Sequence, residues 1–201
     1  MASKTDIFNM AISHLGVSKE IANGDTENSK EASACRRFYD LARQATLKDI
    51  VWPFASKYAT LNLIEENPND DWGYSYRYPS DCLFFRKILS GVRDDTEASR
   101  IAYEISQDAS GLIILTDLED ATCKYTVDVE DETYFQPDFV MAISYRLAYY
   151  IAPRITAGDP FNLGQKAMTN YTIELSKASA NAFNEDQSIT TQDTASIAAR
   201  G

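Results

Sequence analysis

The hydrophobic pattern of this chain changes its period twice, and these changes restrict the possible folds more than any other feature. Apolar residues recur every three or four positions from Ile7 to Leu15 and from Cys35 to Ala45, as in amphipathic helices. From Tyr58 to Val129 the period becomes two, which is typical of half-buried strands. Helical spacing returns after Pro137. We therefore predict an α+β fold, with a helical bundle built from N- and C-terminal helices and a central antiparallel β insertion.

Capping residues predict where the first two helices begin and end. Ser3 can cap the first helix, and Gly16 is a natural stop for it. Asn28 stands three residues before Glu31, which is the spacing of a capping box. The second helix is expected to begin there and to run to about Val51.

Prolines and glycines predict the remaining boundaries. Pro53 has no N–H to donate and restricts Trp52 before it, so the second helix cannot continue. Two prolines and two glycines between Pro153 and Gly164 predict the turn between the last two helices. Short connections within the β insertion predict an antiparallel meander. The chain is thus divided into a bundle (residues 1–56 and 136–183), a β insertion (57–135) and a flexible C-terminal tail (184–201) with little to bury.

Composition limits the function classes. With 30 acidic and 19 basic residues the net charge is -11, the wrong sign for gripping nucleic-acid phosphate. No apolar run approaches the ~20 residues of a membrane span, and the N-terminus lacks the apolar core of a signal peptide. The three cysteines, widely spaced and without a CxxC pair, predict packed thiols in a protein made in the cytosol.

Residue patterns that carry chemistry are scarce. The phosphate-binding patterns GxxxxGK[ST] and GxGxxG are missing, as is the zinc pattern HExxH. The single histidine, His14, is interpreted as a residue favourable near a helix C-terminus. Acidic clusters such as Asp117 to Asp120 are interpreted as solvated turns, because none matches a calcium loop. We therefore assign no catalytic, cofactor-binding or metal-binding residue.

The aromatic residues around the helix-to-strand junction form the candidate interface. The alternation of Trp72, Tyr74, Tyr76 and Tyr78 predicts that all four share one strand face. Such a face can stack bases or sugars, but the nearby acidic residues favour burial or contact with a neighbouring subunit. With residues of the junction and the tail, the candidate interface comprises Trp52, Phe54, Trp72, Tyr74, Tyr76, Tyr78, Asn184, Ile189, Ile197 and Arg200.

The order of motifs in the first half of the chain supports a family resemblance. DIFNMAISHLG is followed by ACRRFYDLARQATL, then WPFA, an L-x-L strand and W-x-Y-x-YRYPSDCL. In order and spacing this resembles the tail tubular protein A family, the head-to-tail adaptors of short-tailed bacteriophages. The similarity is densest over residues 5–89, whereas residues 90–135 carry no matching motif.

The resemblance implies a non-enzymatic virion protein, assembled in the host bacterial cytoplasm. Its implied partners are a portal protein, a tail nozzle protein and further copies of itself, in a ring of twelve through which double-stranded DNA passes without specific binding. Negative walls would repel that DNA, and a tail that orders on the portal would strengthen attachment. Two alternatives stay open: a virion-associated polysaccharide or peptidoglycan hydrolase with paired carboxylates, and another neck protein such as a head-completion protein.

Overall fold

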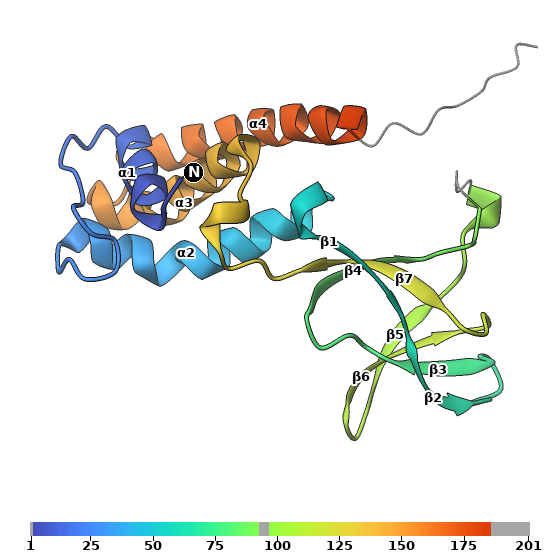
Figure 1. The fold of residues 1–201 in the computed structure, drawn as a ribbon. Helices are drawn as coiled ribbons and strands as arrows, with labels where there is room; N and C mark the ends of the chain where they lie inside the picture. The colour runs from blue at the N-terminus through green and yellow to red at the C-terminus, as the bar shows by residue number, and fades with distance from the viewer. Residues whose placement is uncertain (1, 93–96, 186–201) are drawn as a thin grey trace, which may run out of the picture.

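The structure, a computed structural model, describes residues 2–92 and 97–185. Figure 1 shows an elongated molecule with helices at one end and strands at the other. The helices come from both ends of the chain, and the strands come from the segment between them. The predicted α+β class is therefore confirmed. Below, the helical part denotes residues 2–55 and 136–185, and the sheet part denotes residues 56–135.

Four α-helices make up the helical part: α1 (Lys4–His14), α2 (Lys30–Asp49), α3 (Pro137–Ile155) and α4 (Leu163–Glu185). The Ser3 hydroxyl accepts a hydrogen bond from the Asp6 backbone, and the Asp6 carboxylate accepts one from the Ser3 backbone, which completes a capping box. Pro137 opens α3 at a position where its missing N–H costs nothing. Three short 3-10 turns lie outside these helices: η1 (Pro53–Ala55), η2 (Glu97–Ser99) and η3 (Glu132–Tyr134).

Three predicted helix boundaries are wrong. Ser29, not Asn28, caps α2, because the Ser29 hydroxyl accepts from the backbone N–H of Ala32. Pro153 lies inside α3, and Gly164 lies inside α4, so the turn is shorter than predicted. A Cβ on Gly164 would lie only 2.9 Å from that of Ala152, so this glycine permits the close approach of α3 and α4.

Helix α3 is the centre of the helical part, because it packs against α1, α2 and α4 (Figure 1). Its inward side is fully buried at Phe139, Ile143, Leu147 and Ile151. This is the spacing of one helix face, and burying each such side chain contributes about 1.5–3 kcal/mol. A single hydrophobic cluster joins all four helices through these residues.

The sheet part contains two antiparallel sheets. The three-stranded sheet has the order β1 (Ser56–Thr60), β7 (Thr122–Val127) and β4 (Cys82–Ile88). The four-stranded sheet has the order β2 (Asn62–Glu66), β3 (Tyr74–Arg77), β6 (Gly111–Thr116) and β5 (Glu104–Asp108). Their inner faces share a second hydrophobic cluster, to which Tyr125 and Phe85 come from one sheet and Tyr76 and Ile114 from the other.

The prediction of one meander is wrong, although every strand pair is antiparallel as expected. Strand β7 pairs with β1 and β4, which lie much earlier in the chain. The strand predicted through Leu61 is interrupted there, because the Leu61 N–H donates to the Ala121 carbonyl and the chain passes from one sheet into the other. A period of two identifies strands, but it carries no information on which strands pair.

Two arginines connect the helical part to the sheet part. Arg86, on β4, donates hydrogen bonds to the carbonyls of Leu47 and Ile50 at the end of α2, at 2.9 and 2.6 Å. Arg43, on α2, is 2% exposed and pairs with Asp128 just after β7. Carbonyls at a helix C-terminus have no partner within the helix, so Arg86 satisfies groups that would otherwise need water.

Candidate subunit interface

The residues predicted for the interface fall into different environments. Trp52 is 1% exposed, its indole donates to the Thr46 carbonyl at 2.9 Å, and its ring meets Phe139 edge-on at 4.9 Å. Phe54 is half-buried against Phe135 and Phe139. The assignment of Trp52 to an interface is therefore corrected, because this side chain is part of the subunit's own core.

Tyr76 is likewise a core residue. It is 2% exposed, and its hydroxyl donates to the carbonyl of Leu118 at 2.9 Å. Tyr74 and Tyr78 are half-buried against the same cluster. Burial raises the pKa of Tyr78, which is consistent with a phenol turned into the protein. Of these three tyrosines, only Tyr74 and Tyr78 keep any surface for a partner.

Trp72 lies on the other side of the sheet, so the prediction of one shared aromatic face is wrong. Its indole donates to the Glu104 carboxylate at 3.3 Å. Glu104 is in register with Leu115, which is itself in register with Ser75, so these three residues share one side of the sheet. Tyr76 is in register with Ile114, on the opposite, inner face. The change of side occurs at Gly73, before β3 begins, where strand alternation does not yet apply.

The remaining predicted interface residues are in the C-terminal segment. Asn184 lies in the last turn of α4, inside the helix rather than in the predicted tail. Ile189, Ile197 and Arg200 lie outside the described residues.

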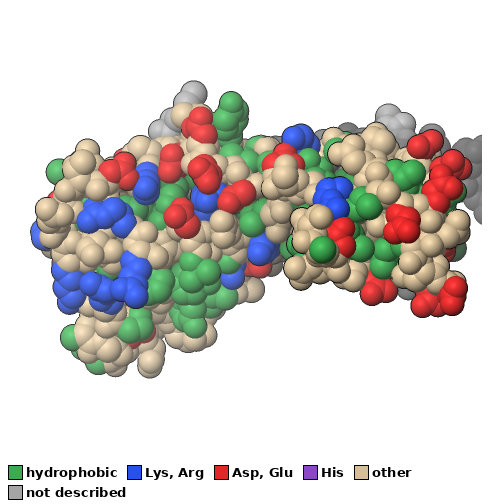
Figure 2. Space-filling model, turned by 90° about the horizontal axis from the view of Figure 1, so that it is seen from below, with side chains coloured by type: hydrophobic (Ala, Val, Ile, Leu, Met, Phe, Trp, Pro, Cys, Tyr) green, Lys and Arg blue, Asp and Glu red, His purple; other side chains and the backbone are tan. Residues whose placement is uncertain are grey.

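The acidity of the chain is concentrated in the sheet part. Residues 56–135 contain 17 acidic and 7 basic residues, whereas residues 1–55 and 136–185 contain 11 of each. Figure 2 shows Lys and Arg side chains gathered at the helical end of one face and mostly Asp and Glu at the opposite end. The net negative charge of the chain therefore comes almost entirely from the sheet part, because the charges of the helical part cancel.

Two acidic turns meet at one end of the four-stranded sheet. The backbone N–H of Gly73, in the β2–β3 connection, donates to the carboxylate of Asp117, in the β6–β7 turn, at 2.9 Å. Burial and the nearby carboxylates of Glu119 and Glu66 raise the pKa of Tyr74.

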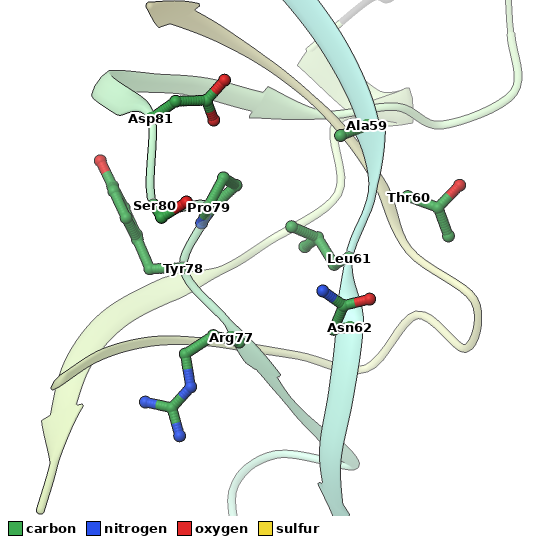
Figure 3. Close-up of a pocket in the computed structure, with 9 residues that line it drawn as sticks. All are labelled: Ala59, Thr60, Leu61, Asn62, Arg77, Tyr78, Pro79, Ser80 and Asp81. Carbon is green, nitrogen blue, oxygen red and sulfur yellow. The ribbon is translucent and has the colours of Figure 1, made fainter. Parts of the chain in front are cut away.

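A pocket of about 270 Å³ lies where β1 passes into β2 and β3 passes into β4 (Figure 3). Its charged side chains are already engaged: Asp81 accepts hydrogen bonds from Lys57 at 2.6 Å and from the Tyr125 hydroxyl at 2.9 Å. Arg77 points away from Asp81 in Figure 3 and makes two hydrogen bonds to Asp108. The ion pair lowers the pKa of Asp108 to about 2, and the Lys57 partner lowers the pKa of Asp81.

His14 contacts a serine, but the two side chains are packed in the protein and do not form a nucleophile–base pair. Its Nε2 lies 3.0 Å from the Ser144 hydroxyl, and its ring stacks on Tyr145 at 3.8 Å. Ser144 is fully buried, and its hydroxyl donates to the Met141 carbonyl. Burial lowers the pKa of His14. A buried hydroxyl that donates to its own helix is not positioned to attack a substrate.

The thiols are packed as predicted, with Cys35 and Cys123 buried and Cys82 half-buried. Burial raises the pKa of Cys35 to about 12 and that of Cys123 to about 11, so both stay protonated at neutral pH. Across residues 2–92 and 97–185, no three metal-ligating side chains are grouped around a possible ion. Within the same residues, every helix is too short or too polar to cross a membrane.

Comparison with known proteins adds no relative. No family model matches the chain, and no curated protein matches it.

Proposed function

We propose that this chain is a subunit of a head-to-tail adaptor ring in a short-tailed phage, placed between the portal and the tail nozzle. The observation that carries the proposal is the position of the motifs in the fold. The segment from Trp52 to Ala55 closes the helical core directly before β1, and YRYPSDCL spans the end of β3 and the start of β4. Of these motifs, which carry the resemblance, the first joins the helical part to the sheet part and the second joins the two sheets.

The charge distribution supports a passive path for DNA. Residues 56–135 have ten more acidic than basic residues, so a ring of such parts would present a strongly negative surface. Favourable contacts with phosphate would act as friction during ejection, whereas negative walls repel the duplex. On this proposal the sheet part lines or borders the DNA path.

The hydrolase alternative lacks a supporting observation in the described residues. A general acid needs a raised pKa, whereas the pKa values of Asp81 and Asp108 are lowered by their cationic partners. The carboxylate of Asp117, in the acidic β6–β7 turn, accepts a hydrogen bond from the backbone N–H of Gly73. We therefore propose the structural role over the hydrolytic one.

Portal capture tests the proposal. The full chain is mixed with the portal ring of the same phage and sedimented. We expect it to sediment with the ring and to saturate near one copy per portal subunit. The same preparation is tested for clearing of a peptidoglycan suspension. Absence of capture at micromolar concentration would contradict the adaptor role, and clearing that a carboxylate substitution abolishes would support the hydrolase.

A further inference from the structure

The loop between α3 and α4, residues 156–162, has a strained backbone. Three of its non-glycine residues are left-handed: Ala157 (φ 55°), Asp159 (φ 60°) and Asn162 (φ 54°). Aspartate and asparagine visit this conformation more readily than other residues, but alanine rarely adopts it. Strain of this kind persists only where the surrounding structure fixes it, and it is concentrated at functional segments. The loop is therefore a candidate functional segment.

Hydrogen bonds to both flanking helices fix this loop. The Gly158 N–H donates to a carbonyl in the last turn of α3 at 2.8 Å, so that Ala157 occupies a helix-ending position where glycine is usual. The Asp159 carboxylate accepts from the backbone N–H groups of Leu163 at 2.7 Å and Gly164 at 2.9 Å, at the start of α4. The conformation of the loop is thus set before any partner binds.

The fixed loop presents apolar side chains to solvent. Phe161 is 73% exposed, the largest exposed fraction of any large hydrophobic side chain in the part of the chain that the structure describes. Ala157 and Pro160 are exposed in the same loop. We define the apolar tip as Ala157, Pro160 and Phe161. A single exposed aromatic side chain is common, but one held outward by a strained loop has the form of an interface anchor that fills a pocket.

Two cations flank the apolar tip. Arg154 lies in the last turn of α3 and Lys166 in the first turn of α4, and both are exposed. Among the described residues, no carboxylate forms an ion pair with either of them. A cation is favourable where Arg154 lies, at a helix C-terminus, but unfavourable where Lys166 lies, at a helix N-terminus. Carboxylates brought by a partner would offset the unfavourable charge.

The position of the loop separates it from the acidic sheet part. Figure 1 shows the loop at the end of the helical part that is farthest from the strands, with α4 running from it toward the sheet part. The chemistry of the tip fits an apolar protein pocket with an acidic rim. Anionic lipid and duplex DNA are less favoured, because the net charge of the chain is -11 and one aromatic anchor gives little membrane affinity.

We propose that the apolar tip inserts into an apolar pocket with an acidic rim on the portal ring. A preformed anchor loses little conformational freedom on binding, which suits the first contact that an isolated subunit makes. In an adaptor between portal and nozzle, that first contact is with the portal, since the nozzle attaches below the adaptor. The inference rests on the proposed function, because it names the surface that meets the portal.

Portal capture of matched variants tests the contact. The full chain is titrated against the portal ring of the same phage, and the bound fraction is measured by sedimentation. Phe161→Ala should weaken capture about tenfold or more, and Lys166→Glu should weaken it several-fold and reduce its dependence on salt. Tyr134→Ala, at an aromatic residue that is 65% exposed on η3, and Lys48→Glu, at an exposed site on α2, are the controls and should be captured as the wild type is.

Urea denaturation of the same variants separates binding from folding, and we expect Phe161→Ala to unfold as the wild type does. Capture of the wild type that Phe161→Ala leaves unchanged, or that Tyr134→Ala weakens equally, rejects the contact and leaves the adaptor role standing. Absence of wild-type capture rejects both. Phosphatidylglycerol vesicles that bind the wild type and not Phe161→Ala would assign the tip to a membrane, and loss of nozzle binding alone would assign it to the nozzle.

Discussion

The helical part and the sheet part differ in where they place their apolar and charged side chains. The helical part has equal numbers of acidic and basic residues, and its core includes Trp52, Phe139 and Leu147, each at most 1% exposed. The sheet part has a large excess of acidic residues and leaves Tyr58, Leu63 and Leu112 about half exposed. The difference teaches that the larger hydrophobic core lies in the helical part, whereas the sheet part leaves more large apolar side chains exposed to other molecules.

The largest expected effect comes from the helical core at the junction. Trp52→Ala removes a buried ring that meets Phe139 and an indole that donates to Thr46. We expect the free energy of unfolding to fall by about 3–5 kcal/mol, measured by urea denaturation. Phe161→Ala is the control, since Phe161 is 73% exposed, and it should change stability by less than about 0.5 kcal/mol. Equal effects at the two sites would remove the contrast between core and surface.

A smaller effect is expected where the two parts meet. Arg86→Met keeps an unbranched, largely apolar side chain but leaves the carbonyls of Leu47 and Ile50 without their donor. We expect a loss of about 1–3 kcal/mol in unfolding free energy. Arg154→Met, at an exposed site on α3, serves as the control and should be nearly neutral. If Arg86→Met proves neutral as well, the two parts are not joined by this arginine.

Sequence periodicity predicts the helices and the strands, but it does not predict how the strands pair. The spacing from Ile7 to Leu15 and after Pro137 identified helices, because one buried stripe imposes a period near 3.6. Strand pairing was not predictable, since β7 joins strands that are more than 30 residues distant in sequence. Pro153 is predicted to begin the turn between the last two helices, but it lies inside the last turn of α3.

The candidate interface was predicted less well than the fold. Aromatic type and alternation predict an interface, yet Trp52 and Tyr76 are buried because the core needs their volume. Trp72 departs from the face of Tyr76, because it precedes the start of β3 and its indole donates to Glu104. Strand alternation applies only inside a strand, and the sequence does not mark where β3 begins.

A pH effect is expected in the helical part. Burial lowers the pKa of His14 in the folded state below the ordinary value of 6.5. The unfolded chain therefore binds the proton first, and stability should fall as pH decreases from above 6.5 toward the lower folded pKa. Urea denaturation between pH 7.5 and pH 5.5 should show this slope, and His14→Gln should reduce it. An unchanged slope in the variant would assign the pH dependence to other groups.

Electron microscopy of the portal ring with this protein tests the adaptor role most directly. The account predicts a second ring of density, of the same rotational symmetry, on the tail-facing side of the portal. The account would be contradicted by portal rings that remain bare at saturating protein concentration. It would also be contradicted by protein that binds DNA and not the portal.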